Sequence, residues 1–222
     1  RLSHSAGATP FMTLLAGFEA LLYRYTGQEQ MLIGAPIANR TRGETEGLIG
    51  FFVNTLVVRG DLSGDPTFNE LIARVRETAL GGYAHQDVPF DKLVEELQPE
   101  RGLNRMPLFQ VVFSLQNAPA EELKLPELEL SMIDLGQATA KFDIVMNLRE
   151  TGDEVSGSIE YNTDLFDAAT IEKMSRHYLK ILESAVAAPE TRVSQLEMLT
   201  EEDRRIFEQK VQVKELEQSF SF

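Results

Sequence analysis

The sequence predicts an α/β fold in which a mixed β-sheet has helices packed on one face. Helical periodicity dominates the start of the chain, short strand-like runs between turn residues dominate its middle, and another amphipathic helix lies near its end. With 222 residues and 43% hydrophobic content, the chain can bury a core of its own. We therefore expect one sizeable domain, or one lobe of a larger one.

The first long helix is predicted to begin at Pro10 and to end before Gly27. Thr9 supplies a hydroxyl at the cap position, and proline is tolerated in the first turn, where its missing N–H costs nothing. Glycine favours the left-handed conformation that ends many helices. The apolar face of this helix comprises Phe11, Leu14, Leu15, Phe18, Leu21, Leu22 and Tyr25. A short strand over residues 31–36 and a polar loop over residues 39–47 follow.

Residues 49–59, with the sequence IGFFVNTLVVR, are predicted to form a loop that feeds a second strand. Asn54 and Thr55 interrupt an otherwise apolar run of residues that strands commonly bury. A buried asparagine needs partners for both its carbonyl and its amide. Two interpretations are therefore open for Asn54: it organises a neighbouring loop, or it faces a polar tunnel.

Two helices and a strand are predicted for the centre of the chain. Thr67 and Glu70 have the spacing of a capping box at the start of the first helix. Pro89 starts a shorter helix, and residues 109–115 have the composition of a buried strand. The expected inner faces of the two helices are Phe68, Leu71, Ile72, Val75 and Ala79, and Phe90, Leu93, Val94 and Leu97.

Further strand-like runs are predicted over residues 128–135, 142–149 and 155–162. The last two flank the turn residues Thr151-Gly152-Asp153, which is the pattern of a hairpin. The run at residues 128–135 is the weakest of the three.

Two helical segments are predicted for the end of the chain. Asp167 caps a helix that ends before Pro189. Thr200, with Asp203 three positions on, begins a charged segment that has the character of a linker helix. We accordingly divide the chain into a domain of residues 1–198 and a linker segment of residues 199–222.

The composition argues against several classes of function. A net charge of −14, from 21 basic and 35 acidic residues, argues against binding to nucleic-acid phosphates, which needs clustered cations. There is no cysteine, which suits a reducing cytoplasm and leaves no thiolate chemistry. No window approaches the ~18 apolar residues needed to cross a bilayer, and the N-terminus lacks the apolar core of a signal peptide. Because the sequence also lacks an initiator methionine, we expect it to be part of a longer protein.

No set of side chains forms a credible catalytic group, so we nominate no catalytic residue and no metal site. His85 and Asp87 lie close in sequence, but such neighbours at a helix junction rarely converge on one proton, and we interpret both as satisfying backbone groups there. His4 and His177 are interpreted as surface or packing residues. The sequence contains no glycine-rich phosphate loop, no zinc-ligand spacing and no nucleophile elbow.

Three ordered segments carry a resemblance to a known family. They are IGFFVNT at residues 49–55 with Arg59, HQDVPF at residues 85–90, and RGLNRMPLFQ at residues 101–110. On these motifs, the chain resembles the C-terminal lobe of a nonribosomal peptide synthetase condensation domain over nearly its whole length.

Two further stretches support the resemblance: GAPIANR at residues 34–40 and EYNTDLFD at residues 160–167. The third motif departs from the family at Gly102, Asn104 and Met106, but it keeps its arginines and its Pro-Leu-Phe sequence. The first motif is similar to that of the ordinary, peptide-bond-forming type of domain.

The resemblance implies a chloramphenicol acetyltransferase-like α/β lobe, an α+β sandwich with a mixed, mostly antiparallel sheet. It implies a reaction in which an acceptor aminoacyl thioester attacks a donor acyl or peptidyl thioester. Both substrates would arrive on 4′-phosphopantetheine arms of carrier proteins, so no cofactor is expected to be attached to this chain. The family's catalytic HHxxxDG motif belongs to the N-terminal lobe and does not occur in this sequence, so the fragment is expected to be inactive alone.

The resemblance also assigns positions to individual residues. The residues expected to line a tunnel or cleft are Gly50, Phe51, Phe52, Asn54 and Thr55. The expected floor loop contains Asn39, Arg40, Arg42 and Glu46. The other motif residues expected at the site are His85, Gln86, Asp87, Pro89, Phe90, Arg105, Pro107, Leu108 and Phe109.

The expected partners are the N-terminal lobe of the same domain, donor and acceptor peptidyl carrier proteins, and a downstream adenylation domain. Carrier proteins are usually acidic, so they would dock on local basic patches. Candidates are Arg74, Arg76, Arg101 and Arg105, with the equal alternative that these arginines are solvated and form weak ion pairs. Without the N-terminal lobe, apolar surface near Phe51 and Phe52 is expected to be exposed and to favour self-association.

An alternative function is a non-catalytic, condensation-like module that recruits carrier proteins or tailoring enzymes. An intact HHxxxDG motif before Arg1 in the parent protein would favour catalysis, and a degraded one would favour recruitment.

Overall fold

The computed structural model describes residues 1–99, 106–116, 139–152 and 154–207. These residues fall into two compact units. The first comprises Arg1–Met31, Gly60–Glu77 and the described chain from Ala169 onward, and the second comprises the described residues of Leu32–Arg59 and Thr78–Ala168. Most helical residues belong to the first unit and most strand residues to the second.

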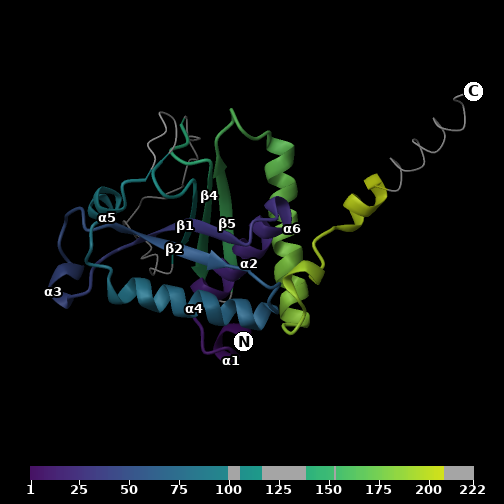
Figure 1. Cartoon of the computed structure of the whole chain (residues 1–222), viewed down its shortest axis with the longest axis horizontal. Helices are drawn as coiled ribbons and strands as arrows, with labels where there is room; N and C mark the ends of the chain where they lie inside the picture. Colours follow the sequence, from purple (N-terminus) through teal and green to yellow (C-terminus); the bar gives the residue numbers. More distant parts are fainter. Residues whose placement is uncertain (100–105, 117–138, 153, 208–222) are drawn as a thin grey trace, which may run out of the picture. The chain divides into compact units, whose positions relative to one another are not determined.

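The strands form a five-stranded mixed sheet in the order β2-β1-β3-β4-β5 (Figure 1). β1 runs parallel to β3, and β3 runs parallel to β4 with Val111 opposite Ile144. β4 and β5 form an antiparallel hairpin in which Ile144 lies opposite Tyr161 and Thr151 opposite Glu154. The strands are β1 Gln30–Ile37, β2 Asn54–Asp61, β3 Val111–Gln116, β4 Ile144–Thr151 and β5 Glu154–Tyr161.

The mixed α/β architecture is confirmed, but antiparallel pairs do not form the majority. β3 has a parallel neighbour on each side, because a long stretch of chain separates it from β1 and another separates it from β4. Such long connections allow the crossover that parallel pairing requires. β2 and β1 run antiparallel, since the N–H of Leu62, just after β2, donates to the carbonyl of Glu29, just before β1, at 2.7 Å.

The helices are α1 Leu2–Ser5, α2 Pro10–Thr26, α3 Gly43–Glu46, α4 Phe68–Ala84, α5 Phe90–Leu97, α6 Ala168–Ala187 and the 3-10 helix η1 Val193–Gln195. Residues 201–207 are also helical. Among the helices in the described ranges, none combines the length and hydropathy required to cross a membrane.

The predicted starts of α2 and α4 are confirmed, as is the end of α2. Thr9 Oγ1 accepts the N–H of Met12 at 3.3 Å, and Gly27 has a φ of 69° at the end of α2. At the start of α4, the N–H of Thr67 donates to Glu70 Oε2 at 2.8 Å, and the N–H of Glu70 donates to Thr67 Oγ1 at 3.2 Å. These bonds satisfy N–H groups that the first turn of a helix leaves without intrahelical acceptors.

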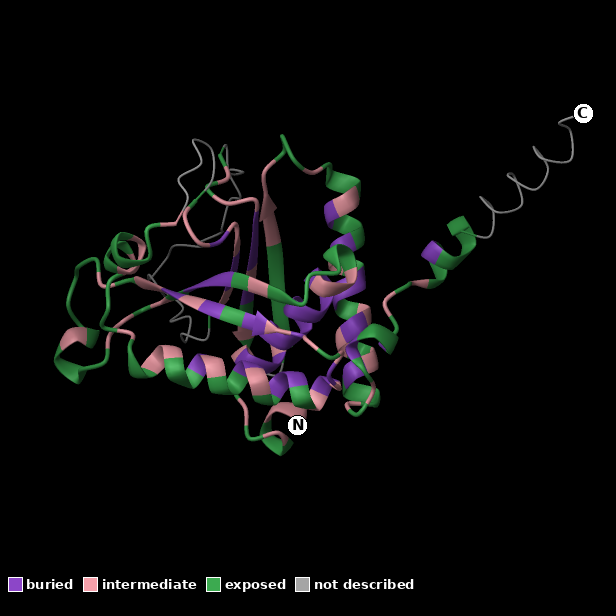
Figure 2. Cartoon of the chain, viewed as in Figure 1, coloured by how far each residue is buried: buried purple, intermediate pink, exposed green. Residues whose placement is uncertain are grey.

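In the first unit, α2 and α6 pack closely against each other. A Cβ at Gly17 would lie 2.5 Å from Leu182 Cδ2, so the missing side chain permits this approach. The hydroxyl of Tyr178 on α6 donates to the carbonyl of Leu14 on α2 at 3.0 Å. Figure 2 shows the buried faces of α2, α4 and α6. Their fully buried side chains include Leu15, Phe18, Leu21, Phe68, Leu71, Ile72 and Ile181.

β3 and β4 each begin two residues later than predicted, at Val111 and Ile144. The loop and strand predicted over residues 49–59 are confirmed: residues 50–53 have no regular secondary structure, and β2 begins at Asn54. The hairpin of β4 and β5 is confirmed, with Gly152 at a φ of 60° in its turn. The strand predicted over residues 128–135 lies outside the described residues.

Candidate functional site

The side chain of Asn54, at the first position of β2, bonds to the backbone of residues 86–90. Its Nδ2 donates to the carbonyl oxygens of Gln86 and Val88, each at 2.8 Å. Its Oδ1 accepts the N–H of Thr55 at 2.9 Å and that of Phe90 at 3.1 Å. Both halves of the amide therefore have partners. The structure supports the first of the two interpretations considered for Asn54, that it organises a neighbouring loop.

The segment 85–90 is a turn held from β2. The N–H of Val88 donates to the carbonyl of His85 at 3.1 Å, and Pro89 takes the N-cap position of α5. The side chains of His85 and Asp87 are exposed. The role predicted for those two residues, bonding to the backbone between α4 and α5, is filled by Asn54.

Phe109 connects the third motif to the first two. Its side chain is buried, and its ring centre lies 5.4 Å from that of Phe90 and 5.7 Å from that of Phe142. Val57 of β2 packs on the same cluster. The ring also fills the space beside β1, since a Cβ at Gly34 would lie 2.3 Å from Phe109 Cε2. The described parts of the second and third motifs and the GAPIANR stretch thus meet at one apolar cluster in the second unit, and Asn54 of the first motif is hydrogen-bonded to the second.

A tight turn at Pro107 and Leu108 precedes Phe109. The N–H of Phe109 donates to the carbonyl of Pro107 at 3.0 Å, and Leu108 has a φ of 71°. This left-handed conformation is uncommon for a residue other than glycine, so the surrounding structure must hold it in place. Arg105 and the preceding residues of the motif lie outside the described residues.

The predicted floor loop folds around Arg40. Its guanidinium carbon lies 4.3 Å from the centre of the Phe52 ring, an arrangement that favours a cation–π interaction. The same guanidinium donates to the carbonyls of Thr45 and Glu46. Asn39 and Arg40 are partly covered, and the side chains of Arg42 and Glu46 are exposed. Arg40 thereby ties the loop that contains α3 to the start of the first motif.

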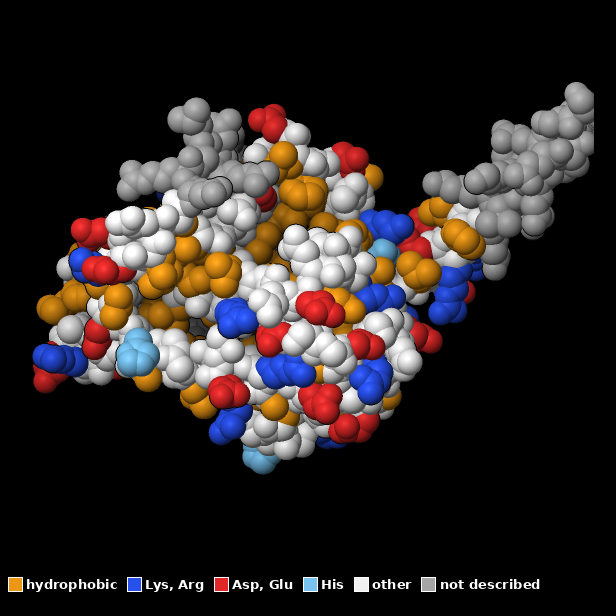
Figure 3. All heavy atoms as spheres, viewed as in Figure 1, with side chains coloured by type: hydrophobic (Ala, Val, Ile, Leu, Met, Phe, Trp, Pro, Cys, Tyr) orange, Lys and Arg blue, Asp and Glu red, His pale blue; other side chains and the backbone are white. Residues whose placement is uncertain are grey.

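Residues 48–53 present an apolar surface, as expected for this part of the chain. Ile49 is 105% exposed and Phe51 is 92% exposed, whereas Phe52 is partly covered. Figure 3 shows hydrophobic side chains gathered over the region of α3 and α5. On the predicted inner face of α5, Phe90, Leu93 and Val94 are partly covered and Leu97 is exposed. The lining of a tunnel by Gly50, Phe51, Phe52, Asn54 and Thr55 stays a prediction.

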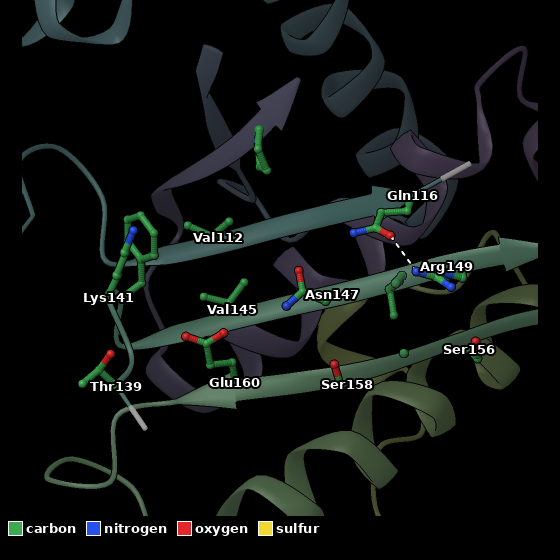
Figure 4. A pocket seen from close by; sticks show the side chains of 14 residues that line it. Val112, Gln116, Thr139, Lys141, Val145, Asn147, Arg149, Ser156, Ser158 and Glu160 are labelled. Carbon is green, nitrogen blue, oxygen red and sulfur yellow. Dashed lines mark hydrogen bonds between the residues drawn. The ribbon is translucent and has the colours of Figure 1, made fainter. Parts of the chain in front are cut away.

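A pocket of about 900 Å³ lies over β3, β4 and β5 in the second unit (Figure 4). Asn147 of β4 and Ser158 and Glu160 of β5 line it, and Arg149 Nη2 donates to Gln116 Oε1 at 3.1 Å along the same strands. These residues were not predicted as site residues. The sequence pattern that could have indicated this pocket is the alternation of polar residues at Ser156, Ser158 and Glu160, which places the three side chains on one face of β5.

One of the arginines considered for carrier-protein docking has a structural role. Arg74 Nη1 donates to the carbonyls of Asp61 at 3.0 Å and Ser63 at 2.9 Å, which stabilises the turn after β2. Arg76 on the same helix is exposed. Arg101 and Arg105 lie outside the described residues.

Comparison with known proteins gives consistent results. A family model described as a condensation domain matches residues 1–207. A linear gramicidin synthase of Brevibacillus parabrevis is 51% identical over 207 residues, which are 92% of this chain and 4% of that protein. Chondramide synthase cmdD of Chondromyces crocatus is 44% identical over 203 residues, which are 91% of this chain and 5% of that protein. The chain therefore spans only a small part of these relatives.

Solved structures share the fold. The X-domain in a complex with OxyB from teicoplanin biosynthesis has a TM-score of 0.80 at 32% identity, covering 90% of this chain and 44% of that one. The condensation domain of the monacolin K polyketide synthase MokA has a TM-score of 0.78 at 23% identity, covering 86% of this chain and 44% of that one. The similarity to the second structure concerns the fold alone.

Proposed function

The chain belongs to the condensation-domain family, and we propose that it is the C-terminal, acceptor-side lobe of such a domain in a nonribosomal peptide synthetase. In the reaction of the whole domain, the amino nitrogen of an aminoacyl thioester bonds to the carbonyl carbon of an acyl or peptidyl thioester. The C–S bond of the donor breaks, and its thiol leaves with a proton. Both thioesters are carried on phosphopantetheine arms of partner carrier proteins.

The assignment to one lobe is supported by length and by the motifs. The structural match to the MokA condensation domain includes 86% of this chain but only 44% of the MokA chain. The motif segments that carry the resemblance are those of the C-terminal lobe, whereas HHxxxDG does not occur in the 222 residues. We therefore propose that the catalytic histidine belongs to a separate lobe of the parent protein.

The observation that carries the proposal is the convergence of the three motifs. Asn54 is hydrogen-bonded to the segment 86–90, and Phe109 packs against Phe90, so the described parts of the three motifs are joined into one element. Beside this element, Ile49 and Phe51 are left exposed. A buried scaffold with an exposed apolar rim is the arrangement expected of a wall that faces another lobe.

The role proposed for this wall is positioning. A reaction between two tethered substrates depends on holding the amine and the carbonyl in register, and small displacements reduce the rate strongly. Asn54 would act as a positioning residue through the backbone that it holds. The pocket over β3–β5 would receive part of a substrate, because it combines apolar walls with Asn147, Ser158 and Glu160. A following adenylation domain and a cytoplasmic location belong to the same proposal.

The test is reconstitution with loaded carrier proteins. The isolated chain, the intact domain, and the chain co-expressed with its matching N-terminal lobe are each mixed with donor-loaded and acceptor-loaded carriers, and the condensed product is measured by mass spectrometry. We expect product from the intact domain and from the two lobes together, and none from the isolated chain. Product from the isolated chain at the rate of the intact domain would contradict the assignment.

A second candidate is supported by one comparison. The solved X-domain that shares this fold at 32% identity was captured in a complex with OxyB, which makes a recruiting module a specific alternative. For that function, the intact parent domain would form no amide product with any loaded carrier, yet it would bind a separate enzyme of the pathway in a sedimentation experiment. Amide formation by the intact domain favours the first candidate.

A further inference from the structure

His177 of α6 is buried, with both ring nitrogens engaged by residues distant in sequence. The side chain is 2% exposed. Its Nδ1 lies 2.8 Å from the Tyr25 hydroxyl on α2, and its Nε2 lies 3.0 Å from Asp203 Oδ2 in the helical segment 201–207. A neutral imidazole that donates through Nε2 and accepts through Nδ1 satisfies all three groups. The first unit thus contains a continuous chain of side chains from α2 through α6 to the segment 201–207.

Asp203 is the point at which that segment is held. Its side chain is 6% exposed, and Lys173 Nζ on α6 lies 3.1 Å from Oδ1. Oδ2 also accepts the N–H of Thr200 at 2.9 Å and its hydroxyl at 2.5 Å, while the N–H of Asp203 donates to Thr200 Oγ1 at 3.2 Å. One carboxylate therefore caps the segment 201–207 and joins it to α6.

The chain leading to Asp203 is held at successive points. Arg24, in the last turn of α2, donates to the carbonyls of Val193 at 3.3 Å and Leu196 at 2.8 Å. Both of those residues have buried side chains. The N–H of Glu197 then donates to Ser184 Oγ of α6 at 3.0 Å. The path from residue 193 to residue 203 thus follows α2 and α6 without a long unattached stretch.

The Tyr25–His177–Asp203 arrangement has the order of a hydroxyl–imidazole–carboxylate relay, but its electrostatics do not suit a nucleophile. Partial burial, reinforced by the negative charge of Asp203, raises the pKa of Tyr25 to about 12. An activated hydroxyl needs the opposite shift or a free base. Burial alone would raise the pKa of Asp203, but hydrogen bonds from Thr200, Lys173 and His177 outweigh it and hold that pKa well below its usual range. The network is therefore suited to holding structure.

We propose that Tyr25, His177 and Asp203 form an anchor that fixes residues 200–207 to α2 and α6, so that the chain leaves this lobe in a set direction. The segment is then a part of the lobe. Asp203 is buried, whereas the other residues of the segment 201–207 are exposed. The anchor itself is independent of the proposed function. Only its consequence, a restricted orientation of a downstream domain, rests on that function.

The test measures the segment directly and does not depend on catalysis. Asp203→Asn keeps the side-chain volume but removes the negative charge of the carboxylate that contacts both Lys173 and His177. We expect hydrogen–deuterium exchange of amides 200–207, and tryptic cleavage after Arg204 and Arg205, to increase by about tenfold or more in this variant. The rate of amide exchange in those parts of α2 and α6 that do not contact the segment 200–207 should stay unchanged. Glu202→Gln, at an exposed position of the same segment, is the matched control and should leave both rates unchanged.

A second variant keeps the proposal testable if Asp203→Asn fails to fold. Tyr25→Phe removes one hydroxyl and retains the ring, so it should fold and should raise exchange in residues 200–207 by a smaller factor. Equal exchange and cleavage rates in wild type, Asp203→Asn and Tyr25→Phe would overturn the anchor. Because these readouts need no carrier protein, such a failure would leave the proposed condensation function untouched.

Discussion

The ring of Phe109 occupies the space where any side chain at Gly34 would begin. A Cβ at position 34 would lie 2.3 Å from Phe109 Cε2 and 2.5 Å from Cζ, far inside contact distance. The ring is packed against Phe90 and Phe142, so it cannot move aside without disturbing the cluster that joins the three motifs.

Gly34→Ala should therefore destabilise the protein by about 1–3 kcal/mol, the usual cost of overpacking a core. Urea unfolding measures the change. The matched test is the double variant Gly34→Ala with Phe109→Leu, in which the smaller side chain makes room for the added methyl group. The double variant should lose less stability than the sum of the two single variants, and strict additivity would contradict the contact.

Asn54→Asp should loosen the segment 86–90. An aspartate keeps an acceptor for the N–H of Phe90, but it replaces the two N–H donors with an oxygen that faces the carbonyls of Gln86 and Val88. We expect a loss of about 1–3 kcal/mol in urea unfolding and faster amide exchange over residues 86–90. Gln86→Ala is the control, because Asn54 bonds to the backbone of residue 86 and not to its side chain.

In the intact domain, a normal condensation rate for Asn54→Ala would rule out the positioning role.

The stability of the protein should decrease as pH rises through neutrality because of Glu19. This side chain is fully buried, and within the described residues neither of its carboxyl oxygens has a hydrogen-bond partner. Burial, reinforced by the charge of Asp61, raises the pKa of Glu19 from 4.5 to about 8. Between these values the unfolded chain releases the proton while the folded chain retains it, so the free energy of unfolding falls with pH.

Thermal unfolding across this pH range measures the effect. Glu19→Gln, which cannot ionise, should lose the part of the pH dependence that arises between pH 4.5 and about pH 8. Glu172→Gln, at an exposed position on α6, should retain it. A wild-type protein whose stability is constant or increases over this range would contradict the assignment to Glu19.

The isolated chain should self-associate through the apolar surface at residues 48–53. Ile49 and Phe51 are almost fully exposed, and surfaces of this kind favour association in water. Sedimentation velocity at increasing concentration should show reversible oligomers in the wild type. Phe51→Glu should shift the protein toward monomer, whereas Leu179→Glu, at an exposed apolar position on α6, should not. A wild type that stays monomeric at high concentration would contradict this prediction.

Much of the secondary structure could be predicted from the sequence because its signals are local. The Thr9 cap, the Gly27 terminus and the Thr67–Glu70 capping box each act within one helical turn, and each is present as predicted. The direction of strand pairing could not be predicted from local signals, because long stretches of chain separate β3 from its neighbours β1 and β4. The partners of Asn54 could not be predicted for a similar reason: its side chain bonds to residues 86–90, which lie far along the chain.

The sequence by itself determined the family, the helix boundaries and the segments that carry the motifs, because residue identity and short-range spacing are enough for those. Only the tertiary structure decided what the individual residues do. Asn54 needed two distant carbonyls to satisfy its amide, and His177, interpreted from sequence as a surface or packing residue, proved to link Tyr25 to Asp203. Hydrogen bonds of this kind depend on which backbone and side-chain groups the fold brings within about 3 Å, and no local pattern specifies that proximity.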